Sequence, residues 1–116
     1  MQLKIQTRKT KELLTKNCKF ASSLPDRILG LLRKSNPRSF LFKTRFGIHT
    51  FFLNKPIDVL VLDRKHTVQS IKEGLQPNKV FFWNPEYFWV LELPQETIKK
   101  SNTKVGDGLE IFGMDE

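Results

Sequence analysis

The sequence predicts a single, mainly β domain, a small β-barrel or sandwich-like fold with two short α-helices. Its 116 residues are a length typical of one domain. Several short segments alternate apolar with polar residues, or are continuously apolar, between Pro, Gly, Asn and Asp residues, as β-strands do. Only two segments, near residues 24–33 and 95–101, have helical signals.

The N-terminal part begins with a period of two. Leu3, Ile5 and Thr7 alternate with polar residues, which predicts an exposed strand, and a second strand ends near Phe20. The helix near 24–33 follows from Pro25, which suits a first turn, and from apolar residues at helical spacing.

The segment after residue 38 predicts a strand with two different faces. Phe40, Phe42 and Phe46 share one face, and Lys43 and Arg45 share the other. We interpret this as an aromatic core face and a basic outer face. A stacking platform for nucleic acid would need rings and cations on the same wet side.

The most apolar segment runs from Pro56 to Leu62 and predicts a strand buried on both faces. Pro56 cannot donate to a ladder, so it sits at the strand's entry. Asp63 begins a turn, where its carboxylate can accept local backbone N–H groups. The segment 67–71 returns as the second strand of a hairpin.

The C-terminal part predicts further strands at 80–83, 87–93 and 109–112. Six aromatic residues lie between Phe81 and Trp89, and we expect most of them in the core, with one or two exposed. Pro94 opens the second helix. These elements give three parts: a basic strand or arm at 1–17, a compact β domain at 18–112, and a frayed tail at 113–116.

The net charge of +8 is concentrated in the first part of the chain. Residues 1–45 carry twelve Lys or Arg against Glu12 and Asp26, a balance of +10, whereas residues 46–116 have a balance of −2. Such a segment is either a solvated surface or a binding surface for nucleic acid or another polyanion. The candidate polyanion-binding residues are Lys4, Arg8, Lys11, Arg33, Lys34, Arg38 and Lys43.

The single cysteine, Cys18, excludes an internal disulfide and favours a reducing compartment. Neither a signal peptide nor a membrane-spanning segment is evident, so we expect a soluble cytoplasmic protein. The partner and the oligomeric state stay open.

Catalytic and metal-binding motifs are weak. Cys18, His49 and His66 lack the spacing of zinc ligands, and no glycine-rich phosphate loop is present, so we expect no metal and no cofactor. Asp58, His49 and Glu92 are the residues that a hydrolase-like enzyme would use. Each also has a structural interpretation: Asp58 bonded to a backbone N–H or an arginine, and His49 as a hydrogen-bonded wall residue.

Four segments together resemble one family. GIHTFFLNKPIDVLVLD (47–63), VLELPQETIKK (90–100) and KVGDGLEI (104–111) resemble domain of unknown function 192, and LPDRILGLLRK (24–34) resembles its N-terminal helix segment. The resemblance extends from Cys18 to Ile111. It implies a compact, mainly β domain with short helices, an uncharacterised activity, and a bacterial or archaeal source. The candidate ligand-wall or motif residues are His49, Pro56, Asp58, Asp63, Glu92, Pro94, Gly106 and Asp107.

Three positions depart from the family pattern. The family often has a glycine where His66 stands, and Ala-Gly where Gln95 and Glu96 stand, and Leu-Met where this chain has Leu31-Leu32. His66 tolerates positive φ less well than glycine. Gln95-Glu96 predicts a regular helix start.

Three functions follow from these patterns. The first is a small non-catalytic binding or accessory domain of unknown ligand, which the family resemblance favours. The second is weak, sequence-independent binding of nucleic acid or another polyanion through residues 1–45. The third is a hydrolase-like enzyme that uses Asp58, His49 and Glu92. We expect the chain not to be an enzyme.

Overall fold

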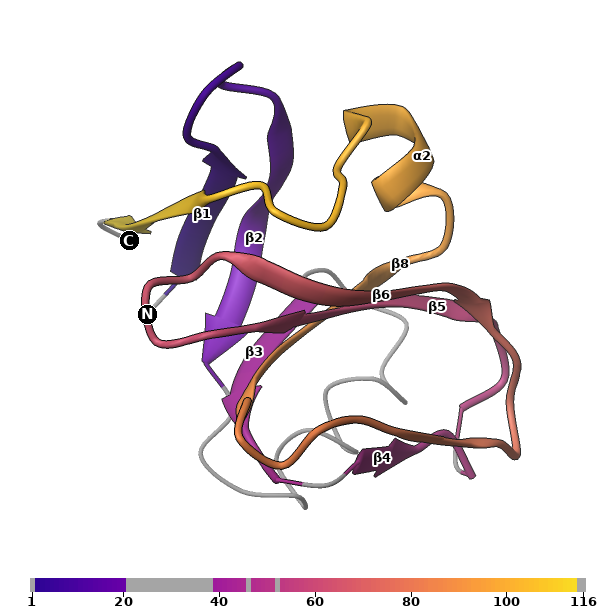
Figure 1. Cartoon of the computed structure of the whole chain (residues 1–116). Helices are drawn as coiled ribbons and strands as arrows, with labels where there is room; N and C mark the ends of the chain where they lie inside the picture. Colours follow the sequence, from indigo (N-terminus) through magenta and orange to yellow (C-terminus); the bar gives the residue numbers. More distant parts are fainter. Residues whose placement is uncertain (1, 21–38, 46, 52, 115–116) are drawn as a thin grey trace.

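The computed structural model describes residues 2–20, 39–45, 47–51 and 53–114 (Figure 1). Within these residues the chain forms a seven-stranded sheet, a two-stranded sheet and one short helix. Across the large sheet the strands are β6 (Val68–Leu75), β5 (Ile57–Leu62), β8 (Trp89–Pro94), β3 (Ser39–Lys43), β2 (Leu13–Phe20), β1 (Gln2–Thr7) and β9 (Leu109–Met114). The small sheet pairs β4 (Gly47–His49) with β7 (Val80–Phe82), and the helix is α2 (Thr97–Ser101). The mainly β prediction is confirmed.

The large sheet curls until its two edge strands approach each other, but it does not close. Thr67 and Gly108 form an isolated bridge, and the Val68 N–H donates to the Asp107 carbonyl over 2.8 Å. Residues 104–107 form a turn here, so the pairing cannot continue along β6 and β9 as a ladder. The predicted barrel is therefore wrong: the sheet is a curled, open one. All its neighbouring strands are antiparallel except β2 and β3, which are parallel.

The described residues contain one helix rather than the two predicted. The helix expected at 95–101 is present as α2, but it begins only at Thr97. Glu96 precedes it in the left-handed conformation, with φ of 72°, and makes no side-chain cap. The prediction of a regular helix start at Gln95-Glu96 is therefore wrong. The helix expected near 24–33 lies outside the described residues.

Both faces of the seven-stranded sheet are covered. On one face, leucines of β5 and β8 pack with Ile98 of α2 and with β1 and β2. On the other face, Val59 and Val90 pack with residues of β3 and with Ile48 of the small sheet. Alternate residues of a strand point to opposite faces, so β5 is buried along its whole length. This confirms the predicted doubly buried strand.

β1 lies inside the sheet, between β2 and β9. The predicted strand is present, but its apolar face is covered: Ile5 is 0% exposed, and Leu3 and Thr7 are also buried. β9 extends to Met114, which pairs with Gln2, so Gly113 and Met114 belong to the sheet rather than to a frayed tail. The basic first part of the chain is thus tied into the fold through its backbone.

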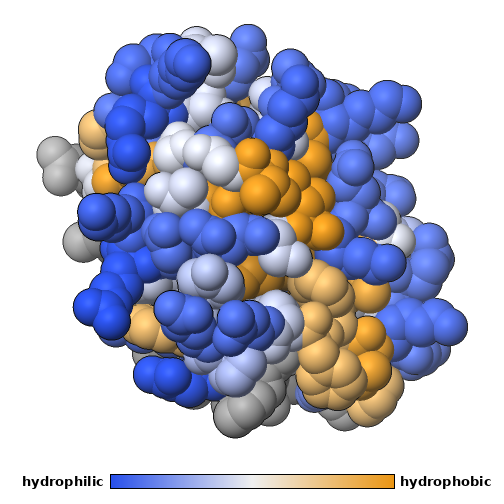
Figure 2. Space-filling view, in the orientation of Figure 1, coloured by the Kyte–Doolittle hydropathy of each residue, from blue (hydrophilic) through white to orange (hydrophobic). Residues whose placement is uncertain are grey.

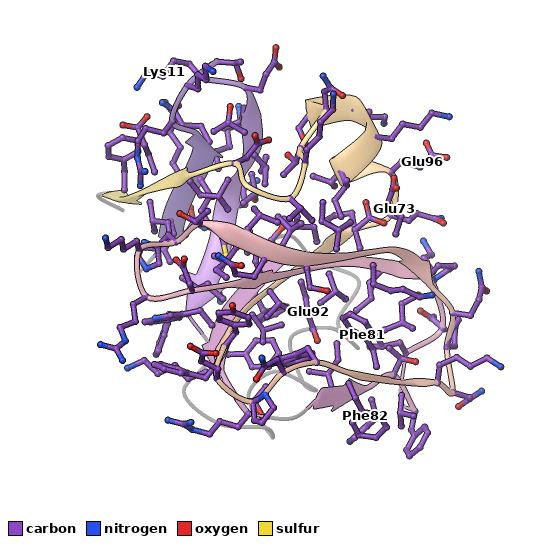
Figure 3. The ribbon with its side chains drawn as sticks, viewed as in Figure 1. Lys11, Glu73, Phe81, Phe82, Glu92 and Glu96 are labelled. Carbon is purple, nitrogen blue, oxygen red and sulfur yellow. The ribbon has the colours of Figure 1, made fainter. Side chains whose placement is uncertain are left out.

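The aromatic residues divide differently from the prediction. Phe40 and Phe42 are buried and Lys43 is exposed, which confirms the core face of β3; Phe46 lies outside the described residues. Between Phe81 and Trp89, however, Phe82 is 69% exposed and the other five rings are half-buried. Phe82 projects outward from β7 (Figure 3) and, with Phe51 and Val80, forms an exposed apolar patch over the small sheet (Figure 2).

Ile5→Ala tests whether β1 is part of the folded body. Removing this fully buried side chain should lower the free energy of unfolding by about 2–5 kcal/mol, because a cavity remains in the core. Lys9→Ala, in the exposed turn after β1, should change it by less than about 0.5 kcal/mol. Urea unfolding followed by circular dichroism measures both. An Ile5→Ala chain as stable as the unchanged protein would mean that β1 is a detachable arm.

Candidate functional site

Asp58 is a buried carboxylate that bonds to two backbone groups. It lies in β5 and is 1% exposed. Its Oδ1 accepts a hydrogen bond from the Gly74 N–H and its Oδ2 accepts one from the Ile98 N–H, both over 2.9 Å. Both oxygens therefore have structural partners. This agrees with the structural interpretation of Asp58.

Glu92 is also buried, but it lies on the opposite face of the sheet. In the register of β5 and β8, Asp58 faces Leu93 and Val59 faces Glu92. Adjacent residues of a strand point to opposite faces, so the two carboxylates do not meet. Figure 3 shows Glu92 in the interior, below the strands β5 and β6.

His49 lies in the small sheet, outside the core. Its neighbour Ile48 points into the core beneath β4, so His49 points outward. Its ring stacks on Phe51 with 4.7 Å between ring centroids, and its Nδ1 lies 3.4 Å from the Phe51 backbone nitrogen, which donates to it. The structure therefore does not bring Asp58, His49 and Glu92 together.

The turn after β5 is organised by Asp63. Its Oδ1 accepts hydrogen bonds from the N–H groups of Lys65 (2.8 Å) and Thr67 (2.9 Å), and Oδ2 accepts one from the Gln69 amide. Burial raises the pKa of Asp63 and is the largest single influence on it, but these hydrogen bonds and the charge of Lys65 together outweigh it and hold the pKa below its ordinary value. The predicted turn role of Asp63 is confirmed by this geometry.

His66 closes the same turn with φ of 63°. Burial lowers the pKa of His66 below its ordinary value, more than the nearby Asp63 carboxylate raises it, and the Arg8 guanidinium adds to the lowering. The His66 ring contacts Trp89 edge to face, with centroids 5.6 Å apart. The ring is therefore a neutral, half-buried group at neutral pH.

Cys18 belongs to the core. It is 0% exposed, and burial raises the pKa of its thiol to about 12, so it does not form the thiolate that nucleophilic attack needs. Within the described part of the chain, no three His, Cys, Asp or Glu side chains come together as metal ligands do. In the same part, no helix has the length and apolar character needed to cross a lipid bilayer.

A cleft of about 690 Å³ lies at one end of the sheet, and we call it the end cleft. Three segments form its walls: the turn after β1, the C-terminal end of α2 and the loop before β9. Its charged residues are Arg8, Lys9, Glu12, Lys104 and Asp107. The remaining lining residues are Thr7, Thr10, Ser101, Asn102, Gly106 and Gly108.

Backbone geometry fixes the walls of the end cleft. A Cβ at Gly108 would lie 2.5 Å from Nη1 of Arg8, so a larger residue there would require the end of the Arg8 side chain to move. Nη2 of Arg8 then donates to the carbonyls of Leu109 (3.2 Å) and Lys65 (3.4 Å). The Asp107 carboxylate accepts the Lys104 N–H over 2.8 Å. Of the predicted motif residues, Gly106 and Asp107 thus lie in this cleft.

Pro56 and Pro94 lie together at a smaller cavity of about 260 Å³. They come from the start of β5 and the end of β8, where Ile57 pairs with Pro94. Leu53 and the polar residues Asn54, Lys55 and Gln95 complete the lining. The predicted wall residues are therefore divided among two hollows, the Asp63 turn, the small sheet and the buried interior.

The predicted cation set does not form one surface among the described residues. Lys4 alternates with the core residues Leu3 and Ile5, whereas Lys43 shares its face with Leu41 of the same core, so Lys4 and Lys43 lie on opposite faces of the sheet. Nζ of Lys11 forms an ion pair with Glu110 at 2.7 Å, and Arg8 donates to backbone carbonyls. Arg33, Lys34 and Arg38 lie outside the described residues.

Sequence reasoning missed most residues of the end cleft and a cluster of aromatic side chains around Trp89. The cleft residues Thr7, Lys9, Lys104 and Gly108 come from turns that are far apart in the chain. The ring of Trp89 contacts its neighbour Phe88 and residues of three other segments. Neither set has a local spacing motif, so no signal in the sequence pointed to it.

The model of the family domain of unknown function 192, described as "uncharacterized ACR", matches residues 5–111. The chain belongs to this family. The match confirms the resemblance found in the motif segments, and it begins earlier, at Ile5 within β1. The family description names no activity.

The chain is also similar to individual proteins. An UPF0127 protein of Pyrococcus abyssi is 37% identical over 71 residues, which are 60% of this chain and 60% of that protein. A Sinorhizobium meliloti protein, described as a proposed transcription regulator, has a TM-score of 0.75 at 21% identity over 94% of this chain and 91% of its own. A Novosphingobium aromaticivorans protein of unknown function has a TM-score of 0.75 at 14% identity over 95% and 84%. At these identities, the two structures establish the shared fold.

Asp58→Asn tests the structural role of the buried carboxylate. The asparagine NH₂ would face one of the two backbone N–H donors, so one donor loses its acceptor, and stability should fall by about 1–3 kcal/mol. Glu73→Gln, at an exposed position of β6, should leave stability within about 0.5 kcal/mol. Chemical unfolding of the two variants makes the comparison. Equal stability of Asp58→Asn and the unchanged protein would contradict this role.

Asp63 should make stability depend on pH in the acid range. Its folded pKa is below the ordinary value, so the folded state favours the carboxylate, and its contribution is present above the unfolded pKa of about 3.9. That contribution is lost as the pH falls through the folded pKa. Asp63→Asn should therefore be less stable than the unchanged protein at neutral pH, with a smaller difference near pH 2. An equal difference at both pH values in urea unfolding would rule the linkage out.

Proposed function

We propose that this chain is a small non-catalytic binding domain that holds an anionic small molecule in the end cleft. The observation that carries the proposal is the charge of the lining: Arg8, Lys9 and Lys104 face two acids, Glu12 and Asp107. The Asp107 carboxylate already accepts a backbone hydrogen bond, which reduces its repulsion of an anion. A volume of about 690 Å³ is in the range of small-molecule sites.

The side chains that line the end cleft, and the positions of Asp58 and Glu92, support a binding role over a catalytic one. The lining of the end cleft contains no His or Cys, and its acids are turn residues in contact with solvent. Asp58 and Glu92, which a hydrolase-like enzyme would use, lie on opposite faces of the sheet. General acid–base catalysis needs both groups within reach of one substrate, and Asp58 and Glu92 do not meet this requirement.

Titration with inorganic tripolyphosphate, followed by two-dimensional NMR of the backbone amides, tests the proposal. We expect shifts confined to residues 7–12 and 101–108, which form the cleft walls. Lys104→Gln should weaken binding by roughly two- to fivefold, the effect of losing one exposed charge contact. Lys79→Gln, an exposed lysine beside β7, is the matched control and should leave binding unchanged.

Two results would overturn the proposal. One is a set of shifts spread over all exposed lysines with equal weakening in Lys104→Gln and Lys79→Gln, which indicates unspecific charge attraction. The other is the absence of any shift at the cleft at low salt, where electrostatic attraction is strongest.

A further inference from the structure

Aromatic rings gather around Trp89, where β2 and β3 end and β8 begins. The centroid of the Trp89 ring lies 6.1 Å from that of Phe20, 5.6 Å from that of His66 and 6.4 Å from that of Phe88. Phe20 and His66 meet Trp89 edge to face, and Phe88 is stacked against it. The four rings come from three different parts of the chain, so the cluster depends on the fold.

Two cations lie over these rings. Nζ of Lys43 is 4.8 Å from the centroid of the Trp89 ring, and the Arg45 guanidinium is 5.1 Å from that of Phe88. Within the described chain, no carboxylate forms an ion pair with either cation. Both cations are exposed, and Nη1 of Arg45 also donates to the Pro85 carbonyl over 3.3 Å, so an anion would compete with that exposed contact.

The cluster is partly open to solvent. Phe20 is 48% exposed, and Phe88, Trp89 and His66 are half-buried. Rings and cations therefore occupy one wet surface, although the rings of β3 itself, Phe40 and Phe42, are buried on the other face, as predicted. Lys43 of β3 is paired with Trp89 of β8, so the two side chains lie beside each other on one face of the sheet. Phe42, the next residue along β3, points to the opposite face. The nearby acid, Asp63, is held by the turn's own N–H groups.

We propose that this surface binds single-stranded nucleic acid, with unpaired bases against the rings and the phosphates on the two cations. We call it the Trp89 surface, formed by Phe20, Lys43, Arg45, His66, Phe88 and Trp89. Exposed rings alone would suit any apolar partner. Here the rings lie beside two cations that form no ion pair with a described carboxylate, on a chain of net charge +8. This combination favours an anionic polymer that carries flat rings.

The occupant is single-stranded because stacking on these rings requires bases that are free of a partner strand. The binding is expected to tolerate any sequence, since every base offers a π-face and no side chain here is placed to read base edges. The Trp89 surface shares no residue with the end cleft. The inference therefore does not depend on the proposed anion site.

Tryptophan fluorescence tests base stacking directly. Trp83→Phe leaves Trp89 as the sole tryptophan, and titration with a short oligothymidylate should quench its emission. Heparin, which is anionic but has no bases, should not quench it at concentrations that give equal charge. Trp89→Phe, which keeps Trp83 packed on the other core, is the mirror control and should show no quenching.

Affinity measurements in otherwise unchanged chains give a second test, which does not depend on the tryptophan variants folding. Phe20→Ala should weaken binding of a labelled oligothymidylate by about tenfold, as loss of one stacking partner does. Phe82→Ala removes an equally large and more exposed ring from the small sheet, outside the Trp89 surface, so it should change nothing. Fluorescence anisotropy at low salt measures both.

The salt dependence separates the cation role from stacking. Each phosphate contact on a single strand contributes about −0.7 to the slope of log affinity against log salt concentration. Lys43→Gln should therefore reduce the slope by about 0.7, and Lys79→Gln should leave it unchanged. Lys104→Gln, in the end cleft, should also leave oligothymidylate binding unchanged.

Three outcomes would overturn the proposal: no binding at low salt, equal binding of heparin and oligothymidylate with no quenching, or equal affinity loss in Phe20→Ala and Phe82→Ala. The second outcome would mean a general polyanion surface without stacking. Duplex DNA bound as tightly as the single strand, with no quenching of Trp89, would also exclude base stacking.

Discussion

The carboxylate of Asp58 joins three elements that otherwise have little local stability. It lies in the doubly buried strand β5 and accepts the N–H of Gly74 in β6 and of Ile98 in α2. Five-residue helices do not persist alone, and Glu96 gives α2 no side-chain cap. Asp58 supplies this cap from a distant strand, and its negative charge also suits the positive end of the helix. Because the end of α2 forms one wall of the end cleft, the shape of that cleft depends on this buried charge.

Local patterns in the sequence were sufficient for the parts of the fold that local physics decides. The run from Ile57 to Leu62 is apolar on both faces because both faces of the sheet are covered, and this is visible in the residues themselves. Asp63 was recognised as a turn residue because its carboxylate can reach the N–H groups that follow it. The family resemblance was found partly in the same segments, since the 47–63 motif contains both Ile57–Leu62 and Asp63.

The register between strands decides which side chains lie side by side on one face of the sheet, and the sequence does not show this register. Asp58 and Glu92 were paired as a hypothesis, but a one-residue difference in register places them on opposite faces of the sheet. Lys43 was correctly predicted to be exposed, but its face of β3 also carries the buried Leu41, and nothing local shows that β8 brings Trp89 beside Lys43. The start of α2 was misread: Glu96 adopts the left-handed conformation just before the helix, at the position where the family pattern has a glycine, and Ile98 two residues later is buried in the core.

The position of β1 has a consequence for the order in which the chain is synthesised. Among the described strands, β1 is synthesised first and one of its two partners, β9, is synthesised last. The hydrogen bond between Gln6 and Glu110 joins residues 104 positions apart. Until β9 emerges from the ribosome, one edge of β1 has unpaired N–H and C=O groups, and a strand of another chain can pair with them. Such distant pairing is slow to form. The nascent chain is therefore most prone to aggregation just before β9 is complete. Basic residues of this edge strand, such as Lys4, oppose association through like-charge repulsion.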